Sequence, residues 1–144
     1  MKFLSRALAF VAILAVALSL AACGGGAPAT IADIPTFPDS TALQPGQSPI
    51  ADTLAQNVKQ AGAMGAKLDQ KIFTLPAETS WEKVKGFYGD KLGGAGWTAG
   101  NLPIPDNDMF KMSVWTRGGQ SLTVAQLIDP SSKDSFLLFS LTSQ

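Results

Sequence analysis

Histidine is absent from this 144-residue chain, and cysteine occurs once, at Cys23. Without histidine there is no Ser-His-Asp or Cys-His catalytic system and no histidine-ligated zinc. A single cysteine forms no disulfide within the chain and no redox pair. An enzyme here would need a carboxylate pair, a Ser-Lys arrangement or a cofactor, and no spacing in the sequence spells these out. We therefore expect a protein that is not an enzyme and carries no cofactor or metal.

An excess of positive charge is also lacking, because 11 Lys and Arg balance 11 Asp and Glu. Two of the basic residues, Lys2 and Arg6, lie in the N-terminal segment, so residues 23–144 carry a net charge of about −2. No basic patch stands out, and we expect no nucleic-acid partner. An anionic membrane surface would not attract this domain either, so a membrane attachment would depend on lipid.

The N-terminal segment has the three-part layout of a secretory signal. Lys2 and Arg6 give a positive start, residues 7–18 are an uninterrupted apolar run, and small residues follow. Its end, Leu20-Ala21-Ala22-Cys23, resembles the bacterial lipobox. That resemblance implies a diacylglyceryl thioether on Cys23, cleavage before it and often N-acylation. It predicts an exported lipoprotein that a palmitate label would mark.

Two other interpretations of this segment stay open. In the first, residues 7–22 form an uncleaved membrane anchor, although a spanning helix needs about 20 apolar residues. In the second, the segment is an ordinary signal peptide and Cys23 has no role in it. The lipobox is favoured because the one cysteine sits at the one position it requires. Two acyl chains hold a protein firmly, since each buried methylene contributes about 0.8 kcal/mol. Gly24 after the cysteine resembles the class permitted in the outer membrane of bacteria that have one.

The sequence thus divides into three parts. Residues 1–22 are the lipoprotein signal peptide, and residues 23–33 are the lipidated cysteine with a flexible tether rich in small residues. Residues 34–144 are long enough for one domain and no more.

Within that domain two segments have helical spacing of apolar residues. The first is residues 50–64, which glycines weaken near Met64. The second is residues 80–92, where Thr79 and Glu82 fit a capping box and Gly93-Gly94 ends the helix.

The remaining segments are typical of strands. Residues 34–40 would be a proline-containing edge strand, and Gly118-Gly119 is a two-residue hairpin turn. The other expected strands are residues 71–75, a short one opened by Trp97, 110–117, 122–128 and 136–141. The predicted class is α+β, an antiparallel sheet of about five to six strands with two helices packed on one face.

Several of these residues together resemble a pattern in small exported bacterial domains. The shared features are Pro35-Thr36-Phe37-Pro38, then Val84, Phe87-Tyr88, Leu92 and Gly96-Trp97, and the Trp115 to Gln120 hairpin. The resemblance spans roughly residues 34–142 and implies an exported α+β domain that ends in an antiparallel meander. It implies no reaction and no catalytic residues. The chain departs from the pattern at Asp39-Ser40, where Gly-Ala is usual, and in the helix at 50–64.

One candidate partner-binding site follows from strand alternation. Trp115 and Arg117 fall on one face of their strand, opposite Phe110 and Met112. If the helices cover the Phe110 face, the Trp115 face is open, and tryptophan beside arginine is typical of protein interfaces. The alternative is that Trp115 packs beneath the tether or the loop at 101–108.

Three further groups have a functional and a structural interpretation, and the structural one is favoured for each. The aromatic residues Trp81, Phe87, Tyr88 and Trp97 would line a ligand pocket or form core. Asp106-Asn107-Asp108 would bind calcium or form a solvated turn. Ser80 with Lys83 would be a catalytic dyad or the start of a helix.

The sequence therefore predicts a membrane-anchored envelope lipoprotein that acts as a non-enzymatic binding module for another envelope protein. It would be exported and held by the lipid on Cys23. The alternative function is a carrier of lipid or another apolar small molecule, in a pocket between helix 80–92 and the sheet.

Overall fold

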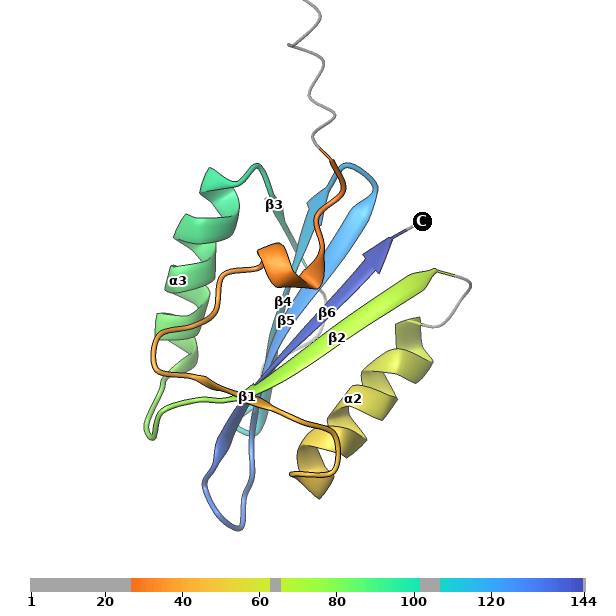
Figure 1. Cartoon of the computed structure of the whole chain (residues 1–144). Helices are drawn as coiled ribbons and strands as arrows, with labels where there is room; N and C mark the ends of the chain where they lie inside the picture. The colour runs from red at the N-terminus through yellow and green to blue at the C-terminus, as the bar shows by residue number, and fades with distance from the viewer. Residues whose placement is uncertain (1–26, 63–65, 102–106, 144) are drawn as a thin grey trace, which may run out of the picture.

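The computed structural model describes residues 27–62, 66–101 and 107–143. A six-stranded sheet has the order β1-β2-β6-β5-β4-β3, and all neighbouring pairs are antiparallel (Figure 1). The elements are η2 (Ile31–Asp33, a 3-10 helix), β1 (Thr41–Leu43), α2 (Pro49–Gly62), β2 (Lys67–Thr74), α3 (Trp81–Gly94), β3 (Thr98–Gly100), β4 (Phe110–Arg117), β5 (Gln120–Ile128) and β6 (Ser135–Ser143). The predicted α+β class is confirmed.

Strand β6 lies inside the sheet, and both of its faces are buried. Each residue from 136 to 141 exposes 4% of its surface or less. Because side chains alternate across a strand, Leu137 and Phe139 join one hydrophobic cluster and Leu138 joins another. A strand with such a continuous apolar run needs a cover on each face of the sheet.

The two helices provide one cover each, so the prediction that both pack on one face is wrong. The ring of Tyr88 in α3 lies 5.4 Å from the ring of Phe139. On the opposite face Leu138 clusters with Leu54 of α2, and Figure 1 shows α2 and α3 on the two sides of the sheet. The physical reason is the apolar run in β6, because two helices on one face would leave Leu138 in water.

The start of α3 differs from the prediction by one residue. The hydroxyl of Ser80 accepts the amide of Lys83 at 3.4 Å. The hydroxyl of Thr79 instead donates to the carbonyl of Pro76 at 2.7 Å. Ser80 is therefore the N-cap, and the predicted capping box with Thr79 as its cap is wrong.

Glycines set the end of α3 and the turn between β4 and β5. The left-handed position after α3 is Gly96, with φ of +81°, so the helix continues through the Gly93-Gly94 pair that the sequence predicts as its end. At the hairpin, Gly118 and Gly119 have φ of +52° and +80°. Both residues of this turn have positive φ, as a type I′ turn requires, and the predicted hairpin is confirmed.

The segment before β1 is not the predicted edge strand at 34–40. It begins with η2, leaves Ile34 buried in the core, and turns at Asp39, which has φ of +57°. The hydroxyl of Ser40 donates to the carbonyl of Phe37 across this turn at 2.6 Å. Pairing with β2 begins only at Thr41, because the prolines of this segment offer no backbone donor to a ladder.

Strand β2 starts four residues earlier than predicted. It pairs with β6 along its whole length, from Lys67 to Thr74. The predicted end of the preceding helix, Met64, lies outside the described residues. No helix in the described part of the chain is long and apolar enough to cross a membrane.

Tyr88 gives the first testable prediction, because it is the only tyrosine of the chain and is fully buried. Burial raises the pKa of its phenol well above the ordinary 10.0, so the folded chain keeps the neutral form when the unfolded chain ionises. Stability should therefore be complete below pH 10 and fall as the pH rises above it. Phenolate absorbance should show native Tyr88 titrating at higher pH than in denaturant.

Tyr88→Phe tests the same site from the other direction. The variant loses the hydrogen bond that the hydroxyl donates to the carbonyl of Pro35 at 3.0 Å, which should lower the free energy of unfolding by about 0.5–1.5 kcal/mol at neutral pH. It should also lose less stability than the wild type above pH 10. Parallel alkaline declines in the two proteins would contradict the burial argument.

Candidate functional site

Trp115 is buried, so the prediction that its face is open to a partner is wrong. It exposes 7% of its surface and belongs to the cluster beneath α3. Arg117, on the same face, donates to the carbonyl of Ala95 at 3.1 Å, and its guanidinium carbon lies 5.1 Å from the ring centroid of Trp97. Arg117 therefore connects the end of α3 to the sheet, and Trp115 is not exposed to a partner.

The aromatic residues of α3, and Trp97 after it, form core, which agrees with the favoured interpretation. Trp81, Tyr88 and Trp97 are buried in the main cluster, and Phe87 packs against it. Val84 and Tyr88 expose none of their surface, so the middle of α3 is closely packed against the sheet. The pocket at the start of α3 has a volume of about 180 Å³, below the roughly 300–1,000 Å³ of ordinary ligand sites. The interface between α3 and the sheet therefore gives no support to the carrier alternative.

The other two groups have structural roles among the described residues. The side-chain carbonyl of Asn107 accepts the amides of Met109 and Phe110 at 3.0 and 2.7 Å, which occupies the central member of the predicted calcium motif. Asp106 lies outside the described residues. The described residues contain no group of three or more possible metal ligands among His, Cys, Asp and Glu. Ser80 caps α3 through Lys83, as a helix start.

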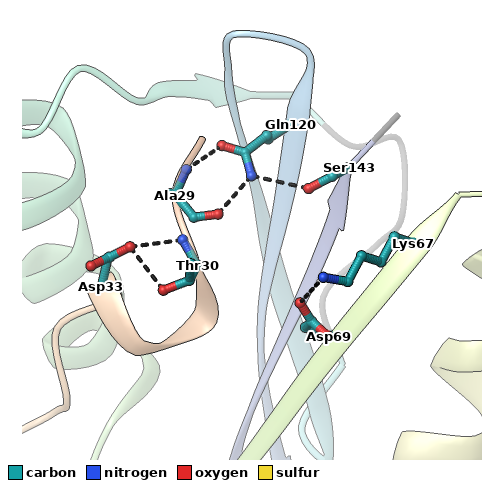
Figure 2. Close-up of polar contacts among 7 residues, drawn as sticks. All are labelled: Ala29, Thr30, Asp33, Lys67, Asp69, Gln120 and Ser143. Atoms are coloured by element: carbon teal, nitrogen blue, oxygen red, sulfur yellow. Dashed lines mark hydrogen bonds and ion pairs between the residues drawn. The ribbon is translucent and has the colours of Figure 1, made fainter. Parts of the chain in front are cut away.

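Cys23 lies outside the described residues, but Ala29, six positions further along the chain, is fixed to the sheet. Gln120 is 6% exposed, and its side-chain amide accepts the N–H of Ala29 at 2.7 Å and donates to the carbonyl of Ala29 at 2.8 Å. Its amide nitrogen also donates to the hydroxyl of Ser143 at 3.0 Å (Figure 2). Gln120 therefore attaches Ala29 to the end of the sheet where β5 begins and β6 ends.

The turn that follows is held by a second local set of bonds. Asp33 accepts the amide and the hydroxyl of Thr30 at 2.8 and 2.9 Å (Figure 2). These hydrogen bonds from the backbone and side chain of Thr30 lower the pKa of Asp33 below its ordinary value. The residues from Ala29 to Asp33, predicted as a flexible tether, belong to the folded domain.

A groove of about 770 Å³ lies where β1 stops, between α2 and β2. This is within the roughly 300–1,000 Å³ of ordinary ligand sites. Its lining includes Leu43 of β1, Ala51, Ala55 and Lys59 of α2, and Gln70 and Ile72 of β2. Sequence reasoning missed this groove, because no local pattern shows how closely α2 approaches the sheet.

Two hydrogen bonds hold the walls of this groove. The side-chain amide of Gln70 donates to the carbonyl of Ala55 in α2 at 3.1 Å. Asp52 accepts the amide of Gly46 at 2.9 Å and so fixes the loop between β1 and α2. The groove is consequently bordered by elements whose relative positions are set.

One side of the groove is an uncovered sheet edge, because β1 pairs only with Ile72, Phe73 and Thr74 of the eight-residue β2. The amide of Leu75, just after β2, donates to the carbonyl of Ser135, the first residue of β6, at 2.8 Å. The backbone groups of Leu75 therefore point toward β6. Backbone groups alternate in direction along an antiparallel strand, so those of Gln70 and Leu68 point away from β6. No backbone partner for these two residues is found among the described residues.

No protein-family model, curated protein or solved structure matches this chain. The class is therefore defined by fold and site. It is a small α+β domain with one helix on each face of an antiparallel sheet, an N-terminal segment attached by Gln120, and an open edge beside a groove.

Gln120→Leu should release the N-terminal segment. It leaves the amide and carbonyl of Ala29 without partners, at a cost of about 1–3 kcal/mol in the free energy of unfolding. Chemical denaturation measures this cost, and limited proteolysis should cleave the variant faster within residues 27–33. Ser143→Ala is the matched control, because it removes a single bond to Gln120 and leaves both bonds to Ala29. Equal stability of the two variants would contradict the attachment.

Proposed function

We propose that this chain is an exported envelope lipoprotein, anchored through lipid on Cys23, whose domain is a non-enzymatic binding module for an envelope protein. The observation that carries the anchor is Leu20-Ala21-Ala22-Cys23 at the end of an apolar signal-like segment. The observation that favours binding is the groove with an open strand edge, whose outward backbone donors and acceptors at Leu68 and Gln70 have no partner among the described residues and could pair with another chain.

The attachment of Ala29 supports this proposal by fixing which end of the domain would be nearest the lipid. Ala29 is six positions after Cys23 in the sequence, and an extended chain spans at most about 3.6 Å per residue. Ala29, and with it the Gln120 end of the sheet, would therefore lie close to the anchor, because Ala29 is at most about 22 Å from Cys23. The β5–β6 turn at the other end of these strands would project away from the membrane (Figure 1).

Palmitate labelling tests the anchor. In cells, the wild type should incorporate labelled palmitate and fractionate with membranes, and Cys23→Ser should lose the label because no thiol remains to carry the thioether. Ala27→Ser is the control, since it changes a nearby residue without touching the four lipobox positions. If Cys23→Ser and the wild type are labelled equally, the anchor proposal is refuted.

A further inference from the structure

We infer that the open edge of β2 binds an extended segment of a partner protein, which adds to the sheet as an antiparallel strand in line with β1. The segment carries acidic, apolar, basic, apolar and acidic residues in that order. This inference deepens the proposed function by naming the surface and the chemistry of the partner.

The chain's own β1 shows how a segment sits on this edge. Thr41 and Leu43 lie opposite Thr74 and Ile72, which are residues whose backbone groups point away from β6. The next two such residues along β2 are Gln70 and Leu68. A partner strand that continues the line of β1 would bond to both, because antiparallel pairing uses every second residue.

The charges on β2 specify one face of the added strand. Lys67, Asp69 and Lys71 alternate along the face opposite α2, and the Lys67 nitrogen lies 3.8 Å from the Asp69 oxygen (Figure 2). The Lys67 side chain is 79% exposed and the Asp69 side chain 46%. Opposite charges directly across an antiparallel pair stabilise it. The partner therefore places an acidic residue opposite Lys71, a basic one opposite Asp69 and an acidic one opposite Lys67.

The groove specifies the other face. Partner residues opposite Gln70 and Leu68 point to the side of the sheet that α2 covers, where Ala55 and Ile72 line the groove. Small or β-branched apolar side chains suit these two positions, because they bury apolar surface without crowding the helix.

A second copy of this chain is a poorer occupant of the same edge. The antiparallel register that overlaps residues 67–71 fully would place Asp69 opposite its own copy and each Lys67 opposite a Lys71. Like charges directly opposite destabilise a strand pair. Exposed lysines on an edge strand discourage such self-pairing.

The other edge of the sheet is protected where β4 begins. Asn107 accepts the Phe110 amide through its side chain at 2.7 Å and donates its own amide to the Phe110 carbonyl at 3.2 Å. These two bonds occupy the backbone groups that a new strand would use at Phe110. Among the described residues, Gln70 and Leu68 have no such cap.

A synthetic peptide tests the inference. The probe is Thr-Glu-Val-Lys-Val-Glu-Thr with blocked ends. The control is Thr-Lys-Val-Glu-Val-Lys-Thr, which keeps the length and the uncharged residues and exchanges every Glu for Lys and every Lys for Glu. Titration by fluorescence anisotropy against the full detergent-solubilised chain should show saturable binding of the probe. The control should bind at least about tenfold more weakly, since three charge pairs change sign.

Variants locate the binding on β2. Leu68→Pro removes an outward N–H that β6 does not use, so it should abolish binding while the fold is kept; Leu68→Thr retains the N–H and should bind within about twofold of the wild type. A Lys67→Glu, Lys71→Glu double variant should reverse the preference between the two peptides. Circular dichroism and thermal melting establish folding, and the reversal remains decisive if Leu68→Pro does not fold.

The outcomes separate this inference from the anchor. Binding of both peptides with equal affinity, or an unchanged preference in the double variant, would overturn the inference. Dimerisation of the wild type without peptide, if Leu68→Pro makes the protein monomeric, would also overturn the inference. The edge of β2 would then bind a second copy of this chain. A wild type that incorporates no palmitate but shows the expected peptide preference would reject only the anchor, because the peptide test does not depend on Cys23.

Discussion

The burial of β6 on both faces is the constraint on which the rest of the structure depends. Residues 136–141 carry an almost unbroken apolar run in which every side chain exposes 4% of its surface or less. Covering only one face would leave half of that run in water, at roughly 25 cal/mol for each Å² of apolar surface. The chain therefore places α3 on one side and α2 on the other, and the sheet becomes the middle layer of three.

The position of α2 has a functional consequence. To reach the far face, the chain leaves the sheet after the three residues of β1 and returns as a helix across β2. This crossing leaves most of the outer edge of β2 uncovered and places a groove beside it. Gln120 attaches the N-terminal segment at the end of the sheet where β2 begins, since Lys67 and Gln120 both lie opposite Ser143 of β6. The attached segment and the open edge of β2 are thus separated by the width of β6 at that end of the sheet.

Much of the fold could be predicted from local chemistry. The hairpin at Gly118-Gly119, both helices and the antiparallel meander follow from periodicity and turn residues. The placement of α2 could not be predicted in this way, because it depends on which face of β6 needs a cover. The structure shows that both faces do, since alternate residues of β6 belong to two hydrophobic clusters. The open face predicted for Trp115 fails for the same reason, because it assumes that both helices cover the Phe110 face. Gln70 and Gln120 carried no signal in the sequence, since a glutamine in a strand does not show which distant carbonyl it meets.

Amide hydrogen exchange along β2, measured residue by residue on the full chain, tests the central claim most directly. The open edge predicts an alternating pattern: slow exchange at Asp69, Lys71 and Phe73, which face β6, and fast exchange at Leu68 and Gln70. Protection should return at Ile72, where β1 begins to cover the edge. Uniformly slow exchange across residues 68–73 would contradict the account, because the edge would then already be paired.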